Sequence, residues 1–250
     1  MSSGSIVWLR PDDTPELFPR PESALAEPNG LLAAGGDLSE ARLLAAYRNG
    51  IFPWYDAGQP ILWWSPDPRC VLRPAGLNVS RRLQQYARRS RLTVAYDTAF
   101  GPVIRACAEK RGHDHGTWIT PEMIAAFEHL HERGWAHSIE VRDGSELVGG
   151  LYGMAIGRVF FGESMFSRTN NASKFAMLGL AGTMLATGLE LLDCQVVSPH
   201  LLSMGAVEMA RDRFTALLAE LCDPPLPVSG WPEGETPVPA ALDAWLAALQ

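Results

Sequence analysis

The order of strand-like and helix-like segments in the second half of this 250-residue chain constrains its fold more than any other feature. Three β-rich segments between residues 136 and 161 are separated by short glycine-containing turns, which predicts an antiparallel meander. A helical pattern follows over residues 173–187, and a further β-rich segment covers residues 191–197. Three strands, a helix and a strand in this order predict an α+β domain with a mixed sheet over residues 68–225.

The segments on either side of this domain differ from it in composition. Residues 1–67 contain Pro- and Gly-rich stretches and a short predicted helix that begins after Ser39, and we expect them to form a small N-terminal lobe. Residues 224–239 hold six prolines. We therefore expect residues 226–250 to be a Pro-rich linker that ends in a short helical tail.

Composition excludes several classes of protein. Hydrophobic residues make up 47% of the chain and charged residues 20%, as in ordinary globular proteins. No apolar segment approaches the roughly 18 residues of a membrane-spanning helix, and no secretion signal is recognisable. The four cysteines are far apart, and a lone His113-Asp114-His115 motif has no third ligand nearby. We therefore expect reduced thiols, no metal and a cytoplasmic location.

The positive charges are unevenly distributed along the chain. The formal net charge is −7, yet residues 68–96 contain seven arginines and no Asp or Glu. Ser80 is a predicted N-cap within this segment, and the helix after it would place four arginines on the face opposite an apolar stripe: Arg81, Arg82, Arg88 and Arg89. Such a face is most often a solvated surface. Without compensating carboxylates it also suits phosphate groups, which guanidinium groups bind in a bidentate manner.

A proline-interrupted aromatic stretch precedes the arginines. Trp54, Trp63 and Trp64 lie within eleven residues, and the prolines among them exclude a regular helix. The composition favours an aromatic packing plug between the two lobes, and a flat aromatic wall for a ligand is the alternative.

Two short segments carry candidate site residues. Strand alternation would place Asp193 and Gln195 on one face, where buried polar groups are costly unless they are satisfied. They form either a hydrogen-bonded structural pair or a site in which Gln195 touches a reacting group. In the second case Asp193 orients Gln195 or binds a cation. Gly162 is expected to mark a bulge that redirects Glu163.

Several long and unusual blocks occur in order along the chain, among them Glu27-Pro28-Asn29-Gly30-Leu31-Leu32, Tyr47-Arg48-Asn49-Gly50-Ile51-Phe52-Pro53-Trp54, Leu62-Trp63-Trp64-Ser65-Pro66-Asp67-Pro68-Arg69, Gly116-Thr117-Trp118-Ile119-Thr120, His137-Ser138-Ile139-Glu140-Val141, Gly162-Glu163-Ser164-Met165-Phe166-Ser167-Arg168 and Asp193-Cys194-Gln195. Together these blocks resemble the leucyl/phenylalanyl-tRNA–protein transferase family, over most of the chain before the Pro-rich stretch. The resemblance implies an acetyltransferase-like (GNAT-like) C-terminal domain after a small N-terminal lobe.

The resemblance also implies an activity. It implies a bacterial cytoplasmic enzyme, without a cofactor, that moves Leu or Phe, and Met less well, from aminoacyl-tRNA. The acceptor is the α-amine of proteins that begin with Arg or Lys, and the new N-terminus is a degradation signal. We expect the enzyme to be a monomer.

The resemblance assigns roles to individual residues. Asp193 and Gln195 would be catalytic, and the four arginines of the helix face would bind the tRNA. Trp54 and Trp118 would flank the 3′-terminal adenosine, with Tyr47 nearby. The aminoacyl pocket would be lined by Leu151, Phe160, Glu163, Leu180, Met184 and Leu192. Leu180 and Met184 replace aromatic residues expected in the family, which leaves the preference for Leu over Phe open.

The lack of a nucleophile motif agrees with direct aminolysis of an activated ester, which mainly needs positioning and a proton path. We expect the carbonyl oxygen of Gln195 to accept a hydrogen bond from the attacking amine. Asp193 would orient Gln195 or attract the acceptor's cationic side chain. Three alternatives are a coenzyme A-dependent acetyltransferase, a non-catalytic RNA-binding module and a cell-wall peptide ligase that uses aminoacyl-tRNA. The first would need a glycine-rich loop, and residues 167–172 contain no glycine.

Overall fold

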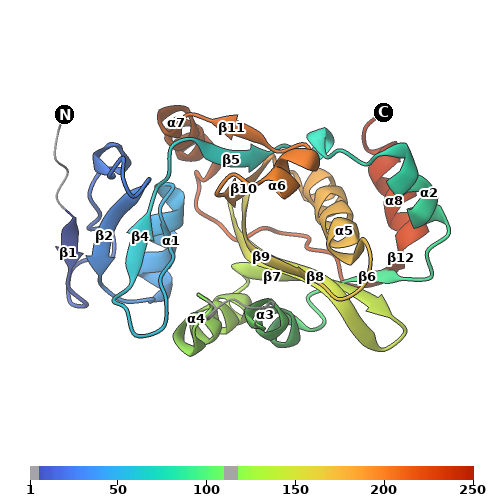
Figure 1. The fold of residues 1–250 in the computed structure, drawn as a ribbon, viewed down its shortest axis with the longest axis horizontal. Coiled ribbons are helices and arrows are strands. Elements are labelled where there is room, and N and C mark those ends of the chain that lie inside the picture. The colour runs from blue at the N-terminus through green and yellow to red at the C-terminus, as the bar shows by residue number, and fades with distance from the viewer. Residues whose placement is uncertain (1–5, 110–117) are drawn as a thin grey trace.

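The computed structural model describes residues 6–109 and 118–250, which form two β-sheets and the helices around them (Figure 1). The strands of the first sheet are β1 (Val7–Leu9), β2 (Leu31–Gly35), β3 (Phe52–Pro53) and β4 (Leu62–Trp64). They follow the order β1-β2-β4-β3 and all lie in the expected N-terminal lobe. β1 runs parallel to β2, whereas β2 and β3 pair antiparallel to β4.

The second sheet contains the remaining strands: β5 (Arg69–Leu72), β6 (Thr93–Tyr96), β7 (Ala136–Asp143), β8 (Glu146–Ile156), β9 (Val159–Ser167), β10 (Leu191–Gln195), β11 (Val207–Met209) and β12 (Gly234–Pro237). Their order is β11-β5-β10-β9-β8-β7-β6-β12. β10 is parallel to β9 and every other pair is antiparallel, so the sheet is mixed.

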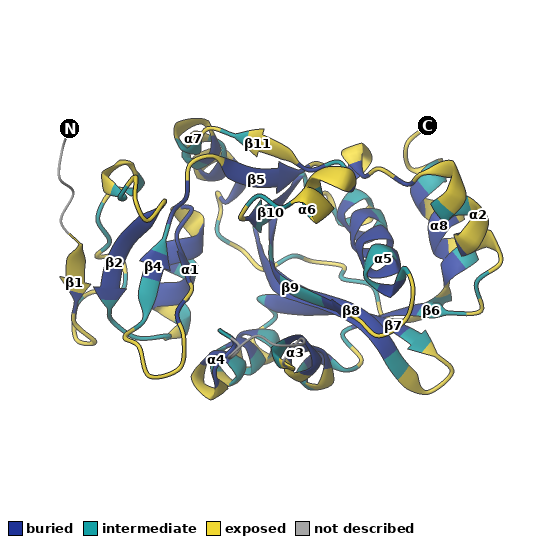
Figure 2. Cartoon of the chain, in the orientation of Figure 1, coloured by how far each residue is buried: buried dark blue, intermediate teal, exposed yellow. Residues whose placement is uncertain are grey.

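The α-helices are α1 (Glu40–Arg48), α2 (Arg81–Arg88), α3 (Phe100–Ala108), α4 (Pro121–Glu132), α5 (Ala172–Thr187), α6 (Pro199–Ser203), α7 (Arg211–Leu221) and α8 (Val238–Ala247). α3 and α4 cover one face of the second sheet, and α5 covers the other face with α8 beside it (Figure 1). The central strands are buried on both faces, whereas α2 and α6 expose long stretches (Figure 2). One core cluster joins the N-terminal lobe to α3, α4 and α7, and a second surrounds α5 and α8.

The predicted α+β class, with a small lobe before a mixed sheet, is confirmed. The meander of β7, β8 and β9 is followed by α5 and β10, and β9 extends beyond its expected end at Phe161. The helix starts predicted at Ser39 and Ser80 are confirmed, and α4 begins in the same way after Thr120. Ser39, Ser80 and Thr120 each accept a hydrogen bond from the backbone N–H three residues later, which satisfies one free donor of the first turn.

Residues 226–250 contain the expected short helix, α8, but the segment before it is not a free linker. β12 pairs with β6 and extends the second sheet, and α8 packs on α5 and buries Leu242 and Trp245. The prolines stand where a missing N–H is tolerated. Pro237 ends an edge strand and caps α8, and Pro239 lies in the first turn of that helix.

The sequence did not predict the strands of the first sheet, nor β5, β6, β11 and α3, and it placed the end of β10 two residues too late, at Val197. The His113-Asp114-His115 motif lies outside the described residues. Within the described residues, no helix has the length and apolar character needed to cross a bilayer.

Candidate active site

Glu163 stands at a β-bulge in the middle of the second sheet. Gly153 of β8 pairs with Gly162, and the preceding Tyr152 pairs with Ser164, so Glu163 is the extra residue of β9. The predicted bulge after Gly162 is thereby confirmed. It leaves Glu163 in the interior, where the residue is only 8% exposed.

Side chains from three distant parts of the chain meet at the Glu163 carboxylate. The hydroxyl of Tyr47 donates a hydrogen bond to Oε1 over 2.6 Å, and Gln195 Nε2 donates to the same oxygen over 2.7 Å. The other oxygen, Oε2, is buried and has no hydrogen-bond partner among the described residues. It can therefore accept a hydrogen bond from a bound group. Tyr47, expected beside a terminal adenosine, is fully buried and offers no stacking face.

Burial raises the pKa of Glu163 from 4.5 to about 7. The main cause is desolvation, which disfavours the charged carboxylate. The hydrogen bonds from Tyr47 and Gln195 act in the opposite direction. Burial, and then the Glu163 charge, also raise the pKa values of Tyr47 and Tyr152 well above the usual value. Near neutral pH the site therefore contains a carboxyl group that exchanges its proton and two phenols that keep theirs.

The raised pKa of Glu163 predicts a pH dependence of stability. Between pH 4.5 and about 7 the folded protein holds a proton that the unfolded chain has lost, so stability falls as the pH rises through this range. The full loss is about 3 kcal/mol. Chemical denaturation of the wild type and Glu163→Gln between about pH 5 and 8 tests this. The wild type should lose stability relative to the variant as the pH rises, and parallel curves would contradict the assignment.

A buried ion pair lies next to the Glu163 network. Arg69 donates from Nε and Nη2 to the two carboxylate oxygens of Asp193, over 2.8 and 2.6 Å, and neither side chain is more than 1% exposed. The guanidinium also donates to the Gly50 carbonyl over 3.0 Å and lies over the rings of Phe52 and Phe214. Both oxygens of Asp193 are thus engaged by Arg69. This arrangement disfavours the alternative in which Asp193 attracts the acceptor's cationic side chain.

Gln195 follows a second irregularity, at the end of β10. The register with β5 shifts between Asp193 and Gln195, and Gln195 has a φ of +61°. Simple strand alternation is therefore wrong at this residue. The backbone N–H of Gln195 donates to Asp193 Oδ1 over 2.9 Å, so Asp193 orients Gln195 through the main chain. Because Nε2 is bound to Glu163, the amide oxygen Oε1 remains as the acceptor of the side chain.

An apolar pocket of about 260 Å³ opens beside this network. Most of the residues expected around an aminoacyl group line it: Leu151, Phe160, Glu163, Leu180 and Leu192. Met184 is buried in the second core cluster and is not among the described lining residues. The volume is just below the roughly 300 Å³ at which pockets for drug-sized ligands begin, which suits a single amino-acid side chain.

The tryptophans of the aromatic stretch divide between two roles. Trp63 is fully buried and meets Phe18 edge-on, as expected of a packing plug. Trp54 is 42% exposed and forms a tilted pair with Trp64, at 5.7 Å between ring centroids. Trp54 is exposed and Trp64 is partly buried, so a ligand could reach this pair but not Trp63.

Trp118 comes from the loop before α4. A hydrogen bond of 3.3 Å between the hydroxyls of Tyr55 and Thr120 joins this loop to the segment that carries Trp54. Trp118 itself is half-buried against the first core cluster. The fold thus ties together the two segments that were expected to hold the terminal adenosine.

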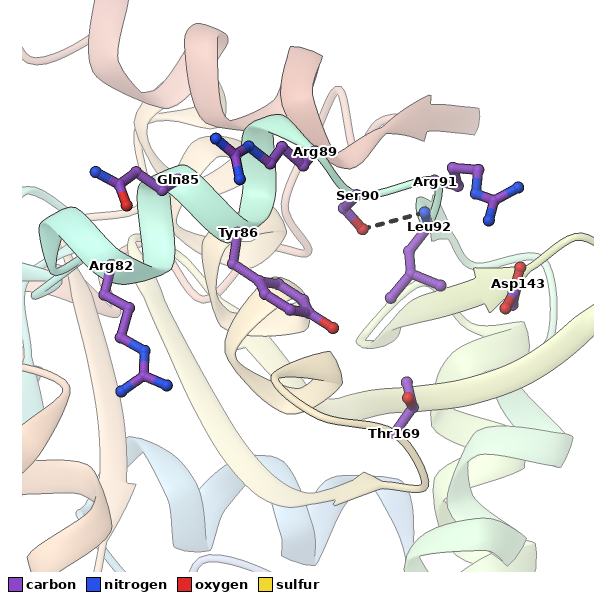
Figure 3. Close-up of a pocket in the computed structure, with 9 residues that line it drawn as sticks. All are labelled: Arg82, Gln85, Tyr86, Arg89, Ser90, Arg91, Leu92, Asp143 and Thr169. Carbon is purple, nitrogen blue, oxygen red and sulfur yellow. Dashed lines mark hydrogen bonds between the residues drawn. The ribbon is translucent and has the colours of Figure 1, made fainter.

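The arginines of α2 lie beside a polar hollow of about 730 Å³, which Figure 3 shows with Tyr86 projecting toward the loop of Thr169. Arg81 and Arg88 do not line it, and Arg88 pairs with Asp243 of α8 over 2.9 Å. The predicted lack of compensating carboxylates is therefore wrong at Arg88, because its partner comes from the far end of the chain. The residues that line the hollow are Arg82, Gln85, Tyr86, Arg89, Ser90, Arg91, Leu92, Asp143 and Thr169.

Arg69 and Tyr152 are among the residues of the site that were not predicted from the sequence. Arg69 was grouped with the arginine-rich segment. Because it lies in an apolar strand, it needs a buried partner, and this need could have marked it as a site residue. Tyr152 lines the pocket on β8, and its buried hydroxyl has no hydrogen-bond partner among the described residues. No feature of the sequence around Tyr152 marks it.

The fold and the site together define an α+β protein with an apolar pocket beside a buried carboxamide and a separate arginine-lined hollow. The model of the leucyl/phenylalanyl-tRNA protein transferase family matches residues 71–219, and that of its N-terminal domain matches residues 36–67. The chain belongs to this family and is an aminoacyl-tRNA–protein transferase.

Similar proteins cover most of the chain. Leucyl/phenylalanyl-tRNA–protein transferase from Hahella chejuensis is 56% identical over 86% of this chain and 90% of its own length. The protein of the same name from Aromatoleum aromaticum is 58% identical over 86% of this chain and 89% of its own. Among solved structures, a GCN5-related N-acetyltransferase from Kribbella flavida aligns with a TM-score of 0.36 and 12% identity, over 66% of this chain and 59% of that chain.

Proposed function

We propose that this protein transfers Leu or Phe, and Met less well, from aminoacyl-tRNA to the α-amine of proteins that begin with Arg or Lys. In this proposal it acts in the cytoplasm as a monomer, and the new N-terminus is a degradation signal. The observation that carries the proposal is the apolar pocket of about 260 Å³, which includes Glu163 in its wall. Glu163 in turn holds Gln195, whose amide oxygen is left to bind an amine.

The proposed reaction is a direct aminolysis. The amine nitrogen attacks the carbonyl carbon of the aminoacyl ester, the C–N bond forms, and the C–O bond to the terminal ribose breaks. The amine proton passes to the departing ribose oxygen. Gln195 Oε1 accepts a hydrogen bond from the amine and thereby orients its lone pair. Glu163 fixes the amide group of Gln195 and Asp193 fixes its main chain, so both act as positioning residues.

The rest of the tRNA end has two proposed contacts. Trp54 and Trp118 stack on the terminal adenosine, and stacking of one base on an aromatic side chain is worth about 1–3 kcal/mol. The arginine face of α2 binds phosphates of the stem, through Arg82 and Arg89 at the hollow and through Arg81 and Arg88 beside it.

A transfer assay tests the proposed function. We expect Leu from Leu-tRNA to appear on a peptide that begins with Arg, and not on the same peptide when its N-terminal amine is acetylated. A second peptide that begins with Ala is the control for acceptor recognition and should react much more slowly. Equal transfer to the Arg and Ala peptides would contradict the acceptor assignment, and no transfer to either would contradict the activity.

The arginine face predicts a salt-dependent affinity for tRNA. Replacing Arg82 and Arg89 by Ala should weaken binding and reduce the slope of log K against log salt by about 0.7–0.9 for each phosphate that the variant no longer neutralises. Arg133 is the control, because it is 62% exposed at the end of α4 and pairs with Glu40. Arg133→Ala should leave the slope unchanged. An unchanged slope in the Arg82/Arg89 variant would place the tRNA elsewhere.

A further inference from the structure

We propose that Trp231 is a positioning residue that sets the selectivity of the aminoacyl pocket, by holding Phe160 in the pocket wall. The inference rests on the proposed function of the pocket. It goes beyond that function because Trp231 does not line the pocket and lies after residue 219, where the match to the family model ends. It also gives a role to the Pro-rich segment that was expected to be a linker.

Trp231 is stacked on two rings of the second core. Its ring centroid lies 5.9 Å from that of Phe160 and 4.0 Å from that of His137, and both pairs of planes meet at 16°. Phe160 is fully buried and lines the pocket. Near-parallel rings at these separations are offset stacks, which restrict the position of each ring. Trp231 is partly buried against the second core cluster and therefore supports one wall of the pocket through Phe160.

The β8 backbone limits the Phe160 ring in another direction. A Cβ atom built on Gly153 would lie 2.5 Å from Phe160 Cε1 and 2.2 Å from the Phe161 carbonyl oxygen. Gly153 is also the register partner of His137 on β7. Phe160 is thus in close contact with the β8 backbone and is stacked on the indole. The β8 backbone is fixed by its strand pairing, so the Phe160 ring can move only on the side of residue 231. We therefore infer that the size of the side chain at position 231 sets the position of this ring.

Trp231 is itself anchored to the sheet. His137, on which it stacks, is bound through Nδ1 to the Asp97 carboxylate over 2.7 Å. Before Trp231 in the chain, the Leu226 carbonyl accepts a hydrogen bond from the Gly157 N–H over 2.8 Å, and after it β12 pairs with β6. The indole therefore occupies a defined place and is not the side chain of a free tail.

A smaller side chain at position 231 should enlarge the pocket. Phe160 would move toward the vacated space, so the pocket would hold Leu less tightly and admit Phe more readily. Apolar pockets distinguish substrates by about 10- to 200-fold per methylene. We expect Trp231→Leu to raise the ratio of kcat/KM for Phe-tRNA to that for Leu-tRNA by about tenfold, and Trp231→Phe to raise it by less.

The experiment compares kcat/KM for Leu-tRNA and Phe-tRNA, with one Arg-initial peptide as the acceptor. Trp231→Phe is the conservative variant, because no described residue pairs with the buried Nε1 and the change leaves no hydrogen-bond acceptor behind. Trp245→Phe is the matched control. Trp245 belongs to the same C-terminal segment and is 4% exposed, but its Nε1 donates to the Pro74 carbonyl and it is not a pocket residue. Thermal unfolding of each variant separates selectivity from stability.

The inference is supported if the Phe-to-Leu ratio rises in the Trp231 variants and stays at the wild-type value in Trp245→Phe. An unchanged ratio in folded Trp231→Phe and Trp231→Leu, or an equal rise in Trp245→Phe, would overturn it. Leu180→Ala changes the pocket lining directly and separates the two proposals. If the Phe-to-Leu ratio changes only in Leu180→Ala, the role of Trp231 is rejected and the pocket assignment stands. If the ratio changes in none of the variants, the pocket assignment is rejected as well.

Discussion

Replacing Asp193 by alanine should lower the free energy of unfolding by about 3–5 kcal/mol. The substitution removes both carboxylate oxygens that bind Arg69 and leaves a guanidinium that is 1% exposed between two aromatic rings. An unpaired charge in such a place keeps the full cost of desolvation without the attraction that offsets it. Urea unfolding followed by tryptophan fluorescence measures the change.

The pair formed by Arg88 and Asp243 is the matched control, because its side chains are 52% and 60% exposed. Asp243→Ala should cost less than about 1 kcal/mol, since water screens the pair and solvates the remaining charge. A double variant, Arg69→Met with Asp193→Leu, should recover much of the stability that Asp193→Ala removes, because no buried charge is then left unpaired. If Asp193→Ala and Asp243→Ala lower the free energy of unfolding equally, the buried ion pair contributes no more to stability than the exposed one, and the prediction is wrong.

Replacing Gln195 by glycine should lower kcat for Leu transfer by about 100-fold or more, with little change in the affinity for aminoacyl-tRNA. In the proposed mechanism the amide oxygen of Gln195 meets the attacking amine mainly as the new bond forms, so its loss would act on the transition state and leave the bound ester untouched. Glycine removes the whole side chain and adopts the φ of +61° at this position without steric cost, so the variant can keep the local backbone. Single-turnover kinetics and tRNA binding separate the two effects.

Gln195→Asn provides the second variant for this prediction. Asparagine tolerates the left-handed backbone and keeps an amide, but it is one methylene shorter and cannot reach both Glu163 and the amine. It should therefore lose most of the activity as well. Full activity in either variant would remove Gln195 from the mechanism, and Asp193 and Gln195 would then be a structural pair.

Signals that act over a few residues predicted local structure well. The predicted caps at Ser39 and Ser80 lie where the helices begin, because each hydroxyl satisfies a donor only three residues away. The glycine at position 162 predicted the bulge that buries Glu163, because the two residues are adjacent in the chain. Candidate residues near such features could therefore be named from the sequence.

Contacts between distant residues decided what the sequence could not predict. Arg69 looked like one more surface arginine because its partner, Asp193, lies 124 positions away in the chain. The Pro-rich segment resembled a linker because neither its pairing with β6 nor the stacking of Trp231 leaves a local pattern. Strand alternation failed at Gln195, because the register with β5 shifts there and the residue has a positive φ. Neither feature is marked by the residue type.

The hydrogen bonds to Glu163 also set the earliest point during synthesis at which the proposed site can form. Tyr47 is separated from Glu163 by 116 positions, and Gln195 by 32 in the other direction. On a translating ribosome this network therefore cannot form until Gln195 has been added to the chain. By the proposed mechanism, the nascent chain cannot consume aminoacyl-tRNA before that point, although aminoacyl-tRNA is the substrate that the ribosome is using to extend it.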